Sequence, residues 1–167
     1  AVAVLVAAVL HQLLPPALRV QPGWVYLVGI VAILVVLFAG DPGRIDQRKR
    51  WLAVVTGTLI GLITAANAYS AVQLVAGILD TAAFTEPVEL LVSGAIVWLT
   101  NGIVFALWFW DLDRGGAAAR AHGGGRPAAL VFPEMSHTEH VPPGWYPVFV
   151  DYLAFSFATA TAFSPTD

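Results

Sequence analysis

The stretch WLAVVTGTLIGLITAANAYSAVQLVAGIL, residues 51–79, contains no charged side chain and decides the fold class. A helix needs about 20 predominantly apolar residues to cross the hydrocarbon core of a bilayer. This stretch exceeds that length, so it predicts a membrane-spanning helix that is tilted, kinked or extended beyond the bilayer.

Three further apolar stretches lie on either side of it. Residues 23–40 are free of charge, and residues 88–110 end in an aromatic belt of the kind found at membrane interfaces. A shorter stretch, residues 1–14, ends at Pro15, which stops a helix. The sequence therefore predicts an all-α, polytopic transmembrane bundle with four spans in residues 1–110.

The overall composition agrees with a membrane location. The 167 residues are 58% hydrophobic and 11% charged, whereas soluble domains carry about 25% charged residues. A net charge of −3 gives no support for nucleic-acid binding, and the lack of cysteine excludes disulfides and thiolate chemistry. Nothing resembles a nucleophile–base pair, a phosphate loop or a haem-ligating pair. We expect a bacterial inner-membrane protein that is not an enzyme and has no cofactor, with the lipid bilayer as its first partner.

The loops between the spans indicate their sidedness. Residues 41–50 hold four basic residues, which predicts the cytoplasmic side, whereas residues 80–89 hold acids and no Lys or Arg. Residues 111–147 are rich in Gly and Pro and contain three arginines, so we expect a second, cytoplasmic loop domain there. The chain starts without Met inside an apolar run, and we interpret it as a fragment of a longer chain.

The C-terminal stretch DYLAFSFATATAFSPTD, residues 151–167, forms a third region with residues 148–150. It resembles the pore helix and filter of the tetrameric potassium-channel superfamily, whose pattern is roughly DYLYFSFVTLTTVGYGD. The matching positions are Asp151, Tyr152, Leu153, Phe155, Ser156, Phe157, Thr159, Thr161 and Asp167. The resemblance implies a re-entrant pore-like helix in residues 148–163 and a homotetramer.

The filter itself departs from the channel pattern. A potassium filter uses rings of backbone carbonyls, and its glycines adopt angles that other residues reach only at a cost. Here Ser164 and Thr166 replace both glycines, and Pro165 removes an amide donor. Potassium selectivity is therefore not expected. The candidate ion-pathway residues are Thr159, Thr161, Phe163, Ser164, Thr166 and Asp167.

Two functions remain open. Hydroxyls and the Asp167 carboxylate suggest passive cation flux through a homotetramer; alternatively the hydroxyls only satisfy backbone carbonyls in a packed bundle. In the second case the chain is a non-conducting accessory subunit of a heteromeric membrane complex. The side from which the pore-like helix enters is also open, because channel pore loops enter from outside and this one follows a cytoplasmic loop. The helix could enter from the cytoplasm, or it could form part of a full crossing. Alternatively, the charge rule assigns the preceding loop to the wrong side.

Other polar residues have simpler expected roles. Glu134, His137 and His140 lie between prolines and predict a solvated loop rather than a metal site. Polar side chains inside the spans are expected to join helices, and Gly57-x-x-x-Gly61 permits close helix contact within or between chains. The polar residues inside the spans are Asn67, Tyr69, Ser70, Gln73 and Asn101, and His11 and Gln12 are expected at the membrane interface.

Overall fold

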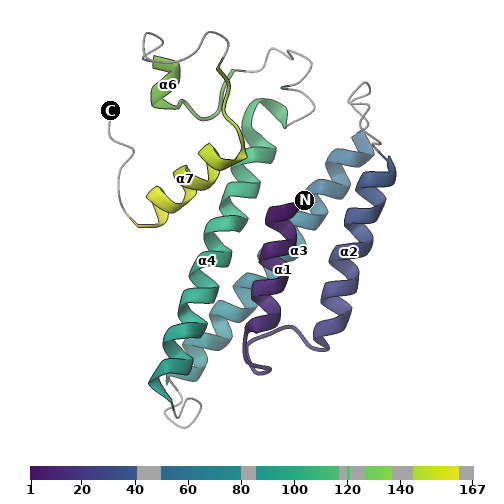
Figure 1. The fold of residues 1–167 in the computed structure, drawn as a ribbon. Helices are drawn as coiled ribbons and strands as arrows, with labels where there is room; N and C mark the ends of the chain where they lie inside the picture. Colours follow the sequence, from purple (N-terminus) through teal and green to yellow (C-terminus); the bar gives the residue numbers. More distant parts are fainter. Residues whose placement is uncertain (41–49, 80–85, 117–119, 121–126, 137–144, 162–167) are drawn as a thin grey trace. The chain divides into compact units, whose positions relative to one another are not determined.

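The computed structural model describes residues 1–40, 50–79, 86–116, 120, 127–136 and 145–161, and all regular structure in these residues is helical. The helices are α1 (Val2–Leu13), α2 (Gly23–Gly40), α3 (Arg50–Leu79), α4 (Pro87–Leu112), the 3-10 turn η1 (Asp113–Gly115), α6 (Pro133–Ser136) and α7 (Phe149–Ala160) (Figure 1). The all-α fold class is therefore confirmed for the described part of the chain.

The described residues form two compact units. The N-terminal unit contains α1, α2, α3 and α4 as far as Val104, and the C-terminal unit starts at Phe105. The predicted regions were bounded at residues 110 and 147, whereas the compact units divide within α4. Each unit is described separately below.

Three of the predicted spans correspond to helices that are long and apolar enough to cross a membrane. They cover residues Gly23–Gly40, Trp51–Leu79 and Pro87–Gly115, with mean hydropathies of 2.5, 1.6 and 2.0. The predicted span at residues 1–14 corresponds to α1, whose 12 residues are fewer than the about 20 needed for a crossing. The chain is thus an integral membrane protein by length and composition of its helices, and a fourth span remains a prediction.

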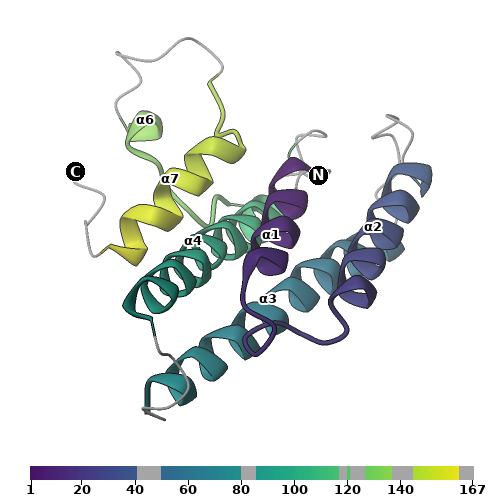
Figure 2. The ribbon, with the colours of Figure 1, turned by 60° about the horizontal axis from the view of Figure 1, so that its bottom comes forward.

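In the N-terminal unit, α1, α2 and α3 pack against one another and lie side by side in both views (Figures 1 and 2). Their outward side chains are large and apolar: Trp24 is 67% exposed, Val72 65% and Leu91, on α4, 74%. Large apolar side chains exposed in such number are rare on soluble monomers. A lipid surround removes the cost of exposing these faces.

The linker between α1 and α2 folds back onto the bundle. Leu14 and Leu18 are buried and form a cluster with Ile96 of α4. The side-chain amide of Gln12 donates to the carbonyl oxygen of Gly23 at 2.9 Å. A Cβ on Gly23 would lie only 2.8 Å from Gln12 Oε1, so a side chain there would require the end of the Gln12 side chain to move.

The polar and small residues in the spans differ in whether they contact another helix. The Nδ2 of Asn67 donates to Oδ1 of Asn101 at 3.3 Å, which joins α3 to α4 as predicted. Tyr69, by contrast, is 44% exposed. At Gly57 and Gly61 an added Cβ would find no described atom within 4 Å. Within the described residues, no neighbouring helix therefore approaches these glycines closely, and a contact with another chain stays a prediction.

Candidate functional site

The helix α7 carries most of the residues of the pore-like motif. It has 12 residues and is about 18 Å long at 1.5 Å per residue. Its start is fixed by Asp151, whose Oδ2 accepts a hydrogen bond from the Val148 amide at 2.7 Å. A carboxylate in the first turn also interacts favourably with the positive end of the helix dipole.

Aromatic side chains attach α7 to the last turns of α4. The ring of Trp110 meets Phe149 and Tyr152 edge-on, with centroids 6.0 and 5.4 Å apart. Phe109 meets Phe155 at 5.3 Å. Such edge-to-face pairs contribute about 0.5–1.5 kcal/mol each beyond area burial. Within the C-terminal unit, α7 therefore lies beside the end of α4 (Figures 1 and 2).

Phe132 closes this aromatic cluster from the segment that precedes α6. Its side chain is buried, and its ring lies 5.2 Å from Tyr152, 6.1 Å from Phe155 and 6.3 Å from Trp145. The loop region predicted from its Gly and Pro content thus contributes a specific packing residue to the C-terminal unit.

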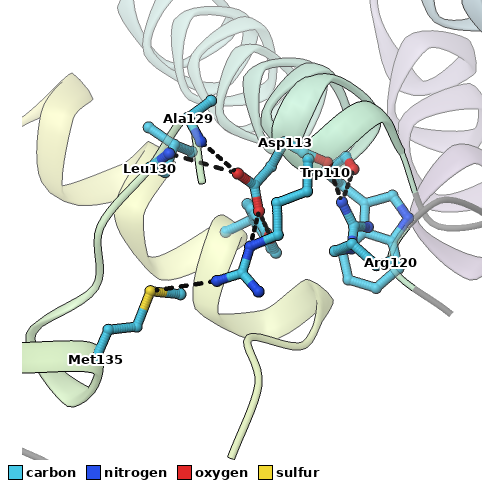
Figure 3. Close-up of polar contacts among 8 residues, drawn as sticks. Trp110, Asp113, Arg120, Ala129, Leu130 and Met135 are labelled. Atoms are coloured by element: carbon cyan, nitrogen blue, oxygen red, sulfur yellow. Dashed lines mark hydrogen bonds and ion pairs between the residues drawn. The ribbon is translucent and has the colours of Figure 1, made fainter. Parts of the chain in front are cut away.

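Asp113, directly after α4, is the polar centre of the C-terminal unit. It is fully buried. Its Oδ2 accepts a hydrogen bond from the Tyr152 hydroxyl at 2.6 Å. Its Oδ1 accepts hydrogen bonds from the backbone amides of Ala129 and Leu130 at 2.9 and 3.4 Å (Figure 3). A buried carboxylate is costly without such partners, and the Arg114 guanidinium, with Nε 3.8 Å from Oδ2, adds a counter-charge.

The end of α4 is shaped by the chain reversal after Asp113. Arg114 has a φ of 51°, and Gly115 and Gly116 have φ of 81° and 93°. A Cβ on Gly116 would lie 3.1 Å from the Asp111 carbonyl oxygen, so both backbone angle and space favour glycine there. The reversal lets the Arg114 Nη2 reach Sδ of Met135 in α6 at 3.4 Å.

Arg120 completes the network by capping α4. Its Nη1 donates to the carbonyl oxygens of Trp110 and Asp113 at 2.7 and 2.8 Å. Its guanidinium carbon lies 4.2 Å from the Trp110 ring centroid, a cation–π contact visible in Figure 3. A cation that binds the last carbonyls of a helix also interacts favourably with its dipole.

The environment of Tyr152 keeps its hydroxyl in the donating form. Tyr152 lies on α7, outside the three candidate spans. Burial, followed by the hydrogen bond to Asp113, raises the pKa of Tyr152 well above its ordinary value of 10.0. The phenol is therefore protonated at neutral pH and donates to the carboxylate.

Two of the predicted ion-pathway residues are described: Thr159 lies in α7 and Thr161 directly follows it. The Thr159 hydroxyl donates to the carbonyl oxygens of Phe155 and Ser156 at 3.0 and 2.9 Å. The Thr161 hydroxyl donates to those of Phe157 and Ala158 at 2.8 and 3.2 Å. Both side chains are exposed, so their oxygen lone pairs remain accessible. The other four predicted residues, Phe163, Ser164, Thr166 and Asp167, lie outside the described residues.

The remaining sequence candidates contribute less. Glu134 is exposed, and His137 and His140 lie outside the described residues; within the described ranges no group of three or more His, Asp or Glu side chains is placed to hold a metal. An apolar groove of about 580 Å³ opens between α3 and α4, lined by residues such as Ile78, Leu91 and Trp98. Its apolar lining offers no carboxylate or carbonyl side chain to an ion.

Sequence reasoning missed the Asp113 network. The available signal was an acidic residue at the very end of an apolar span, followed by Arg114 and Arg120. No family model, no curated protein and no solved structure matches the chain. A function for the chain is therefore inferred from the geometry of this site and from the pore-like motif.

Proposed function

We propose that the chain is a channel-like protein of the bacterial inner membrane, in which α7 is a re-entrant pore-type helix. Four copies would form a homotetramer that conducts cations passively through a mouth made by residues 159–167. One observation carries this proposal: α7 is short and is held at its N-terminal half by a buried polar network at the end of α4. A helix of about 18 Å cannot cross a hydrocarbon core of about 30 Å.

The polarity of α7 supports a cation path. The C-terminal end of a helix carries a partial negative charge because its last carbonyls lack helical partners. At that end Thr159 and Thr161 are exposed, and their hydroxyl oxygens add acceptors beside the carbonyls. In the proposal Phe163, Ser164 and Thr166 continue this path, and Asp167 attracts cations to it.

The second candidate is a non-conducting accessory subunit of a heteromeric membrane complex. It is favoured by the donation of both threonine hydroxyls to carbonyls of their own helix, which is the behaviour expected of Ser and Thr in packed membrane helices. The open face at Gly57 and Gly61 suits a partner helix in either case.

Flux through liposomes tests the first candidate. The purified chain is reconstituted with a cation-sensitive dye inside, and Asp167→Asn is compared with the charge-preserving control Asp167→Glu. We expect Asp167→Asn to lower cation flux several-fold and Asp167→Glu to retain most of it, because the attraction depends on charge. Equal flux from wild type and Asp167→Asn would remove the proposed role of this carboxylate.

The mass of the particle extracted gently from its native membrane separates the two candidates. Four identical chains support the channel, whereas one copy bound among unrelated subunits supports the accessory role. A heteromeric particle together with absent flux would overturn the channel proposal.

A further inference from the structure

His11 is buried where three parts of the N-terminal unit meet. It lies in the last turn of α1, and its side chain is 2% exposed. Its Nε2 is 3.1 Å from the backbone nitrogen of Val20 in the α1–α2 linker. Its ring centroid is 4.5 Å from that of Tyr26 in α2, and its Nδ1 is 3.5 Å from the Ser70 Oγ in α3. His11 is thus covered by protein on the side of the linker, because the linker folds back over α1; its expected position at the membrane interface stays a prediction.

The hydrogen-bond pattern assigns one tautomer to His11. The Val20 amide can only donate, so Nε2 must present its lone pair. The proton of the neutral ring is then on Nδ1, directed at the Ser70 oxygen. Ser70 donates its own proton to the Ala66 carbonyl oxygen at 3.1 Å and has a lone pair free to accept. Neutral His11 therefore satisfies every group in this chain of bonds.

Protonated His11 would fit this environment poorly. A proton on Nε2 would face the Val20 N–H, donor against donor, and break the contact with the linker. Among the described residues, two charged or titratable side chains face His11: Arg19 on the linker and Tyr26 on α2. The α3 residue that faces it, Ser70, is neutral. Helix α4 contacts the linker through the apolar residue Ile96. Within the described residues no carboxylate forms an ion pair with His11 or Arg19.

We propose that His11 is a proton-operated latch, which holds the linker of residues 14–22 on the bundle when neutral and releases it when protonated. The inference is independent of the proposed cation flux. Since residues 41–50 predict the cytoplasmic side at the far end of α2, the latch responds to the pH on the opposite side.

The direction of the pH effect follows from linkage. His11 lies outside the three candidate spans, and burial together with the nearby Arg19 lowers the pKa of His11 below 6.5. The native state then binds fewer protons than the unfolded state near this pH. The contribution of neutral His11 to the stability of the native state is complete at pH values above the ordinary histidine pKa. It is lost as the pH falls through that value towards the lowered pKa of His11 in the native state.

Pulsed EPR on the reconstituted chain tests the latch. The sequence has no cysteine, so nitroxide labels can be attached to Ala17→Cys in the linker and Ala53→Cys on α3, both exposed positions. Ala53 lies about 25 Å along α3 from Ser70, a suitable range for the method. Distances are measured at about pH 8 and about pH 5, on either side of the ordinary histidine pKa.

We expect a narrow distance distribution at the higher pH and a broad one at the lower pH. His11→Gln can accept from Val20 and donate to Ser70 without titrating, so it should remain narrow at both. A matched variant with His122, His137 and His140 all changed to Gln should keep the wild-type response. An unchanged wild-type distribution at low pH, or broadening that persists in His11→Gln, would overturn the proposal.

A second measurement covers the case in which His11→Gln does not fold. Imidazole ¹⁵N NMR of the wild type reports which ring nitrogen carries the proton. An unprotonated Nε2 and a protonated Nδ1 at about pH 8 support the assigned bonding. A protonated Nε2 at that pH would contradict it.

Discussion

Tyr152→Phe is the substitution that most directly measures how much the hydrogen bond between Tyr152 and Asp113 stabilises the position of α7. It removes the hydroxyl that donates to Asp113 at 2.6 Å and keeps the ring that contacts Trp110 and Phe132. The loss of packing is therefore small, and the measured change in stability reports the hydrogen bond.

The expected magnitude follows from the geometry. The distance lies in the range of charge-assisted O–H···O⁻ bonds, and hydrogen bonds to charged groups contribute about 1.5–3 kcal/mol to stability. Tyr152 and Asp113 are both fully buried, so water cannot replace the lost donor. Asp113 keeps its amide donors and Arg114, which limits the penalty. We expect the free energy of unfolding to fall by about 2 kcal/mol, or about 30-fold in the unfolding equilibrium.

Unfolding in mixed micelles, followed by the near-ultraviolet signal of the aromatic cluster, measures this change. Tyr146→Phe is the matched control, since Tyr146 is 68% exposed and should lose less than about 0.5 kcal/mol. Asp113→Ala, which leaves the Tyr152 hydroxyl and two amides unpaired, should cost more, about 3–5 kcal/mol. Equal unfolding free energies for Tyr152→Phe and Tyr146→Phe would mean that the hydrogen bond between Asp113 and Tyr152 does not stabilise α7.

Two further substitutions test other parts of the structure. A Cβ added at Gly57 would lie within 4 Å of no described atom outside its own helix turn. For Gly57→Leu we therefore expect an unfolding free energy within about 0.5 kcal/mol of wild type but a smaller particle in native electrophoresis. An unchanged particle mass would exclude this face as a contact between chains. Gly116→Ala places a Cβ 3.1 Å from the Asp111 carbonyl at a φ of 93°, so we expect a loss of about 1–2 kcal/mol in micelle unfolding. Wild-type stability of Gly116→Ala would mean that the chain reversal after α4 is not fixed by this glycine.

The helical spans were predictable because apolar length is a property of consecutive residues. The predicted spans at residues 23–40, 51–79 and 88–110 correspond to α2, α3 and α4 within about two residues at each end. The stretch at residues 1–14 forms a helix, as its composition predicts, and its 12 residues fall short of a crossing. Span number was the uncertain part, because a short apolar helix can pack in a bundle as well as cross a membrane.

The polar contacts were less predictable because they join residues far apart in the chain. Asp113 and Tyr152 are 39 positions apart, and no helical period relates them. His11 was expected at the interface because it follows an apolar stretch, and only the folding of the linker over α1 explains its burial. The Asn67–Asn101 bond was foreseeable in kind, since polar groups in spans seek one another, although the pairing itself was not.

The distribution of contacts along α7 bears on both candidate functions. Tyr152 and Ser156, in its first eight residues, are buried, whereas Thr159 and Ala160 at its end and Thr161 directly after it are exposed. The buried polar network therefore fixes one end of the helix and leaves the other end uncovered within the described residues. A rigid support is what a site needs when it must present backbone carbonyls at a fixed place. The two candidates differ in what meets the exposed end: further copies of the chain around an ion path, or another subunit. Particle composition therefore has to be measured before flux is interpreted.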